Sequence, residues 1–174
     1  MYKRKNGGCR MKLLYSNILP LGTEEDQETI MDCFNEQMKM ADRVEIAVGY
    51  TSNASLAELD RLVNECNISK VCLNIGMYFI EGMPEGAYHT AIKINEKWQE
   101  AGIGEIRVVK AFKYHGKLFC FYKDGNPFSA IIGSANLGVI KLEASNRRQY
   151  EMSAITTDEQ EVAEIAEHIE KLKM

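Results

Sequence analysis

The sequence is poor in the features that mark membrane-spanning, secreted and metal-binding proteins. Its 174 residues contain no apolar run close to the ~20 residues that a membrane span needs. No apolar segment follows the basic residues at the N-terminus, so nothing indicates secretion. The five cysteines form no Cys-x-x-Cys pair, and the three histidines show no metal-ligand spacing. We therefore expect a reduced, cytoplasmic protein with no membrane partner, metal or cofactor.

The chain also lacks an excess of positive charge, since its net charge is −4. A domain that holds nucleic acid unaided is usually basic. Three interpretations remain open: the partner is not nucleic acid, the contact is confined to a local basic patch, or a separate domain or subunit provides the recognition.

The pattern of apolar residues predicts one α/β domain over residues 11–174, after a flexible basic tail at 1–10. Helices are expected at 24–40, 52–66, 86–101 and from Asp158 onward, with Thr23, Ser52 and an Asp158-x-x-Glu161 capping box at their starts. Strands are expected at 43–50, 69–79, 105–112 and 150–157, together with a hairpin over 113–138. This order predicts a mixed sheet with helices on its faces.

The hairpin carries polar residues at its open end, in "KYHGKLFCFYKDGNPFSAIIGSANLG". Side chains alternate along a strand, so His115 and Lys117 share a face, as do Ser134 and Asn136. A four-residue loop over 124–127 would place Lys117 opposite Ser134 and His115 opposite Asn136. The four side chains would then meet at one point.

Such a cluster suits a phosphodiester. Lysine supplies positive charge, and asparagine and serine supply donors for a pentavalent transition state. Histidine serves as nucleophile or as general acid–base at neutral pH. The spacing alone leaves an ordinary interpretation open, in which His115 and Lys117 are a polar strand end and Gly-Ser-Ala-Asn is a turn.

His115-x-Lys117 followed by Gly133-Ser134-x-Asn136 resembles the paired signature of the phospholipase D superfamily. Together with the hairpin and "IAVGYTS" on an early strand, it is most similar to the nuclease branch, above all to the catalytic domains of NgoFVII-type restriction endonucleases. The likeness covers most of residues 40–155. It implies a mixed sheet of about six or seven strands sandwiched between helices. It also implies an endonuclease that hydrolyses DNA without metal, through a phosphohistidine intermediate.

The resemblance also implies roles for single residues. His115 would be the nucleophile or the acid, Lys117 and Asn136 would bind the phosphate, and Ser134 would support them. Glu151 matches the acidic residue that orients the histidine, and Glu143 is the weaker alternative for that role.

One position departs from the family pattern. That pattern continues with an aspartate five residues after the lysine, where this chain has Tyr122, and Asp124 comes two residues late. The nuclease branch dispenses with this aspartate more readily than the lipases do, so its absence favours a nuclease and leaves a weakened or inactive enzyme open.

Four basic residues are the candidates for contacts to flanking phosphates: Lys110, Lys113, Arg147 and Arg148. A glycine- and proline-rich loop after the second strand is expected over the site. There Tyr78 or Phe79 stacks on a base or packs in the core.

The family reaction uses two histidines with opposite roles, whereas this chain has one copy of each motif. The sequence therefore predicts a homodimer with a composite active site at its two-fold interface. The alternative is a non-catalytic module that binds DNA or protein and retains the fold. Nothing in the sequence indicates the DNA sequence recognised, or DNA rather than RNA.

Overall fold

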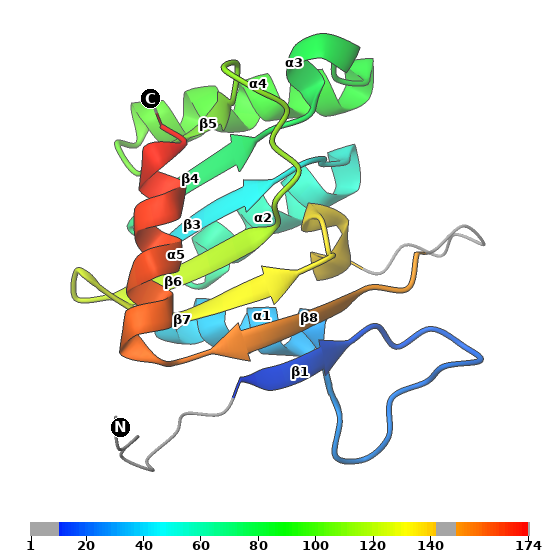
Figure 1. Ribbon diagram of the computed structural model, residues 1–174. Coiled ribbons are helices and arrows are strands. Elements are labelled where there is room, and N and C mark those ends of the chain that lie inside the picture. Colours follow the sequence, from blue (N-terminus) through cyan, green and yellow to red (C-terminus); the bar gives the residue numbers. More distant parts are fainter. Residues whose placement is uncertain (1–10, 142–148, 174) are drawn as a thin grey trace.

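The computed structural model describes residues 11–141 and 149–173, which form one mixed sheet with helices on both faces (Figure 1). Its strands are β1 Lys12–Tyr15, β2 Glu28–Thr29, β3 Arg43–Val48, β4 Lys70–Ile75, β5 Gly104–Val108, β6 Leu118–Lys123, β7 Asn126–Gly133 and β8 Met152–Thr156. Its helices are α1 Ile30–Met40, α2 Asn53–Glu65, α3 Tyr78–Glu81, α4 Glu85–Glu100 and α5 Glu159–Lys171, with a short 3₁₀ helix η1 Leu137–Ile140. The α/β prediction is confirmed.

The sheet has eight strands in the order β2-β1-β8-β7-β6-β3-β4-β5, more than the six or seven expected. The additional strands are β1 and β2 at one edge, whose apolar pattern is too short to be seen in the sequence. Strands β3, β4 and β5 are parallel, and β6, β7 and β8 alternate in direction beside them. This is the mixed sheet that the order of elements predicts.

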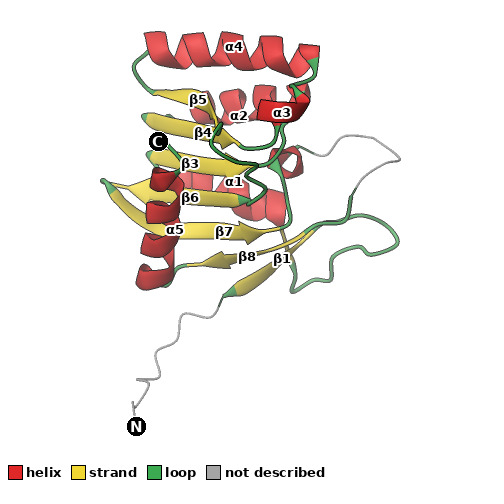
Figure 2. Ribbon diagram, turned by 45° about the horizontal axis from the view of Figure 1, so that its top comes forward, coloured by secondary structure: helices red, strands yellow, loops and turns green. Residues whose placement is uncertain are grey.

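The two faces of the sheet are covered unequally (Figure 2). Helices α1, α2 and α4 pack on one face over the larger apolar core, around Phe34, Phe119 and Trp98. Helix α5 alone covers part of the other face through Val162 and Ile169. Thr29, Ser52 and Asp158 cap α1, α2 and α5 through their side chains, so Ser52 and Asp158 are confirmed and α1 starts later than predicted. The capping box of α5 is only half formed, because Glu161 accepts from Thr156 instead of from the cap.

The predicted register of the central hairpin is wrong. The turn contains two residues, Asp124 and Gly125, both with positive φ (51° and 82°), as in a type I′ hairpin. Pro127 lies inside β7 next to a bulge at Phe128, and Leu118 pairs with Ile132 instead of Gly133. The β6–β7 ladder ends there, with one further hydrogen bond from the Gly133 N–H to the Lys117 carbonyl at 3.4 Å, and Ser134 donates its N–H to the Met152 carbonyl at 3.0 Å. The site residues therefore lie at the strand ends or just beyond them.

Candidate active site

The candidate catalytic residues lie where several strands end or begin, at the end of the sheet that is on the right in Figure 1. Strands β3, β4 and β7 end at this edge and β6 and β8 begin there, because the two groups run in opposite directions. Open α/β sheets bind ligands just outside such strand ends. The predicted site residues follow or precede these strands directly.

His115 and Lys117 lie in the segment that leads into β6. The Lys117 Nζ is 3.0 Å from His115 Nδ1 and 3.1 Å from Nε2, and it donates to the His115 carbonyl at 2.6 Å. The His115 ring is exposed, whereas Lys117 is only 8 % exposed. Burial lowers the pKa of Lys117, and the nearby charge of Glu151 partly opposes this shift.

The segment carrying His115 is fixed by a close backbone contact. Tyr114 donates its N–H to the Gly76 carbonyl at 3.1 Å, and a Cβ on Gly76 would lie 2.1 Å from the backbone carbonyl oxygen of Tyr114. Tyr114 is buried, and its ring packs on His168 of α5 with centroids 5.9 Å apart. The backbone before His115 is thereby held against both the end of β4 and helix α5.

Asn136 is held by its oxygen, and its side-chain nitrogen has no hydrogen-bond partner among residues 11–141 and 149–173. Its Oδ1 accepts from the N–H of Gly49 at 3.1 Å and of Tyr50 at 3.0 Å. A Cβ on Gly49 would lie 3.1 Å from the His115 ring and 3.4 Å from Asn136 Oδ1, so both side chains flank this glycine. The Asn136 NH₂ group remains as a fixed donor beside the imidazole.

Ser134 and Glu151 form the remaining part of the site. The Ser134 hydroxyl is hydrogen-bonded to the Glu151 carboxylate, and it accepts from the Met152 N–H at 3.1 Å. The Glu151 N–H donates to Ser16 Oγ at 3.0 Å, which ties β1 to the site. In the described part of the chain Glu151 contacts Ser134 and not His115, so its orienting role stays a prediction.

The structure brings five predicted residues to one edge: His115, Lys117, Ser134, Asn136 and Glu151. The remaining predicted residues are not part of this group. Lys110 is exposed, and Lys113 is exposed with its Nζ 3.6 Å from Glu81. Glu143, Arg147 and Arg148 lie outside the described residues.

The segment predicted as a loop over the site contains the short helix α3. The Tyr78 hydroxyl donates to the Thr51 carbonyl at 2.5 Å, and its ring packs edge-to-face on Tyr50. Phe79 is half exposed. Tyr78 therefore supports the site wall, and base stacking by Phe79 stays a prediction.

The sequence did not predict the groups that hydrogen-bond to the site residues. These groups are the backbone N–H groups of Gly49 and Tyr50, which bond to Asn136, and the Ser16 hydroxyl, which bonds to Glu151. The glycine that ends the buried run "EIAVG" was the available signal, because a strand end without a side chain allows close approach. Ser16 gives no signal, since it acts only through β1.

The motif position that departs from the family pattern lies away from this site. Tyr122 is at the opposite end of β6, about 16 Å from Lys117 at ~3.3 Å per residue. Its hydroxyl lies 3.4 Å from Glu45 Oε2, and the Arg43 guanidinium lies over its ring. An aspartate at this position would therefore not reach a phosphate held by Lys117.

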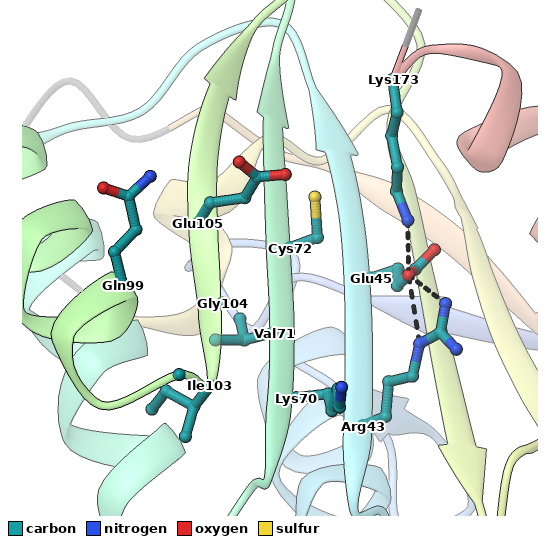
Figure 3. A pocket seen from close by; sticks show the side chains of 11 residues that line it. Arg43, Glu45, Lys70, Val71, Cys72, Gln99, Ile103, Gly104, Glu105 and Lys173 are labelled. Carbon is teal, nitrogen blue, oxygen red and sulfur yellow. Dashed lines mark hydrogen bonds and ion pairs between the residues drawn. The ribbon is translucent and has the colours of Figure 1, made fainter.

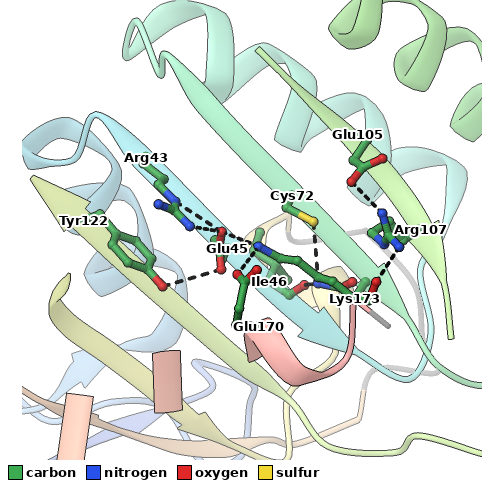
Figure 4. A network of polar contacts seen from close by, with 10 residues as sticks. Arg43, Glu45, Ile46, Cys72, Glu105, Arg107, Tyr122, Glu170 and Lys173 are labelled. Carbon is green, nitrogen blue, oxygen red and sulfur yellow. Dashed lines mark hydrogen bonds and ion pairs between the residues drawn. The ribbon is translucent and has the colours of Figure 1, made fainter. Parts of the chain in front are cut away.

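That opposite end has a depression of about 480 Å³ and a network of charges (Figures 3 and 4). The Glu45 carboxylate, 2 % exposed, bonds to Arg43 and lies 2.7 Å from Lys173 Nζ. Lys173 also pairs with Glu170, and Arg107 donates to the Lys173 carbonyl. The network fastens the end of α5 to the sheet, and its acids and bases pair with each other.

Comparisons with known proteins identify the family and the fold. The family model described as "NgoFVII restriction endonuclease N-terminal PLD domain" matches residues 28–174. No curated protein sequence matches.

Several solved structures share the fold. The phospholipase D family member Nuc from Salmonella typhimurium superposes with a TM-score of 0.62 at 15% identity, covering 93% of this chain and 92% of that one. NucT from Helicobacter pylori gives 0.59 at 16% identity, covering 94% of each chain. TrmBL2, described as an archaeal chromatin protein with a novel mode of DNA binding, gives 0.51 at 13% identity, covering 81% of this chain and 46% of that one. At these identities the structures show the shared fold, and the family match extends from β2 through α5. The chain therefore belongs to the family of the NgoFVII restriction endonuclease N-terminal PLD domain.

Proposed function

We propose that this protein is a phosphodiesterase that cleaves DNA, with His115 as nucleophile. The observation that carries the proposal is the convergence of an exposed imidazole, a buried ammonium and a fixed amide donor at one edge. These groups match what a phosphoryl transfer needs: a nucleophile, a positive charge and a donor to non-bridging oxygens.

The proposed reaction has two steps, and side chains of the protein act as nucleophile, acid and phosphate ligands. The neutral His115 ring attacks phosphorus, so a P–N bond forms as the P–O bond to the leaving group breaks. A protonated histidine gives its proton to the leaving oxygen. Water then attacks the phosphohistidine, giving a proton back to the second histidine, and the P–N bond breaks. Lys117 and Asn136 stabilise the charge on the phosphate oxygens in both steps.

The second histidine is proposed to come from a second copy of the chain. One imidazole cannot be the neutral nucleophile and the charged acid in the same step. Neither His89 nor His168 has a lysine two residues further on. Two exposed apolar side chains support such a dimer: Leu13 and Ile132 are both paired with the buried Ala154, one on each side of β8. Sedimentation at micromolar concentration tests this step, and a fully active monomer contradicts it.

The test of the function is cleavage of DNA in excess EDTA. We expect activity that persists in the chelator and is lost in His115→Ala. The second candidate, a module that binds DNA or protein without cleaving it, is favoured by the fold shared with TrmBL2. Binding of DNA without cleavage, with or without added metal, would support that candidate.

We place the protein in the cytoplasm, with DNA recognition contributed by a separate domain or subunit. None of the helices in residues 11–141 and 149–173 is long and apolar enough to cross a membrane.

A further inference from the structure

Glu81 of α3 connects two segments that border the site. Its Oε2 accepts a hydrogen bond from Tyr50 Oη at 3.1 Å, and its Oε1 lies 3.6 Å from Lys113 Nζ. Tyr50 packs edge-to-face on the His115 ring with centroids 6.0 Å apart, and Lys113 lies two residues before His115. The carboxylate is thus one tyrosine side chain away from the proposed nucleophile.

The partners of Glu81 are the donors that a phosphate would use. An ammonium and a phenol hydroxyl converge on its two oxygens. The Tyr50 hydroxyl is protonated at neutral pH like that of any tyrosine, and its pKa is raised further, first by desolvation and then by the hydrogen bond to Glu81. Two preformed donors therefore point at one anionic group.

This carboxylate is easily exchanged for another anion. The side chains of Lys113 and Glu81 are 51% and 46% exposed. Ion pairs at such exposure contribute little to stability, so the replacement of Glu81 by a phosphate loses little. Glu81 is also the last residue of a helix of only four residues, none of them buried, and Gly82 follows it at φ 76°.

We propose that Tyr50 Oη and Lys113 Nζ form a subsite for the phosphate next to the scissile one in a nucleic-acid strand. Glu81 occupies this subsite until the substrate displaces it. The inference rests on the proposed function, because it takes the phosphate at His115 and Lys117 as the scissile one. It names the substrate class as a polymer of phosphodiesters, since a molecule with one phosphate fills only the catalytic position.

The test compares two substrates in EDTA: a short single-stranded oligonucleotide and bis(4-nitrophenyl) phosphate, which has a single phosphate. We expect Glu81→Gln to raise the ratio of their kcat/KM values, oligonucleotide over diester, about three- to ten-fold, mainly through a lower KM. Lys113→Ala should lower this ratio and reduce the salt slope of oligonucleotide binding by about 0.7, the value for one phosphate contact on a single strand.

Glu85→Gln is the matched control, because it removes the same charge from a 90% exposed carboxylate at the start of α4. Its ratio should equal that of the wild type. Equal ratios in Glu81→Gln and the wild type, or equal changes in Glu81→Gln and Glu85→Gln, would overturn the subsite. If the wild type hydrolyses neither substrate, the proposed function fails, and binding of the oligonucleotide by fluorescence anisotropy decides the subsite. Tighter binding by Glu81→Gln alone supports it, and identical binding by the three proteins refutes it.

Discussion

The two ends of β3 hold polar side chains in opposite ways. At its start, Glu45 is buried and meets Arg43 and Lys173, so the charges at this end are matched within the protein. At its end, the backbone of Gly49 and Tyr50 holds Asn136 by one atom only and leaves its amide donor open. Charges paired with each other stabilise a fold, whereas donors fixed from one side are prepared for a ligand.

His115→Ala should produce the largest loss of activity of these variants, with little change in stability, as expected for a residue at the ligand-binding end of β3. Loss of the nucleophile should lower kcat for DNA by at least about a thousand-fold. The His115 ring is exposed, so the urea midpoint should stay within experimental error. His89→Ala, an exposed histidine on α4, is the control and should keep wild-type activity. Equal activity in the two variants would show that the site end is not catalytic.

Asn136→Asp separates the two halves of one side chain. The carboxylate still accepts from Gly49 and Tyr50, but it replaces the amide donor with a negative charge beside the phosphate. Activity should therefore fall about a hundred-fold while the fold is retained. Asn136→Ala should in addition lower the free energy of unfolding by about 1–3 kcal/mol, because two backbone N–H groups lose their acceptor. A stable, fully active Asn136→Asp protein would contradict the account.

The pH profile tests the charge of Lys117. Burial lowers its pKa below the ordinary 10.5, so its charge and the activity should be lost as pH rises through a value below 10.5. Lys117→Arg, which stays charged in this range, should keep about a tenth of the activity and show no such alkaline loss. An identical alkaline limb in both proteins would assign it to another group. The same shift predicts a stability contribution in the opposite direction, since protonated Lys117 is disfavoured in the fold, so its share of stability increases as pH rises towards 10.5.

Glu45→Gln should change activity least of these variants. A larger change would show that the two ends of β3 do not differ in function as described. The free energy of unfolding should fall by about 2–3 kcal/mol, below the value for a fully buried pair because Arg43 and Lys173 keep some exposure. Specific activity of the folded protein should stay within about two-fold. Glu105→Gln, which loses an exposed ion pair with Arg107, is the control and should change stability by less than about 1 kcal/mol. A large loss of activity at unchanged stability would give this end a functional role.

Much of the fold follows from the sequence because long apolar patterns determine it. The runs at β3, β4 and α5 and the caps Ser52 and Asp158 are local features, and their elements form where predicted. Strands β1 and β2 escape prediction, because their stability comes from pairing with β8 and with each other. Such contacts leave little pattern in a run of two to four residues.

The candidate site was found in the sequence for a reason that the structure corrects. The prediction placed the four side chains together by alternation along an extended hairpin. The type I′ turn and the bulge at Phe128 shift the actual register by one residue. The residues still come to the same end of the sheet, because the first motif directly precedes β6 and the second begins at the last residue of β7. The supporting contacts of Gly49, Ser16 and Glu81 cross the fold and could not be read from spacing.

The most direct test of the central claim is to look for the covalent intermediate on His115. The protein is mixed with DNA, quenched at alkaline pH, where a P–N bond survives, and digested for mass spectrometry. The account predicts a nucleotidyl or phosphoryl adduct on the peptide containing His115, absent from His115→Ala. Steady cleavage of DNA with no adduct at any time after mixing, or an adduct on another residue, would contradict it.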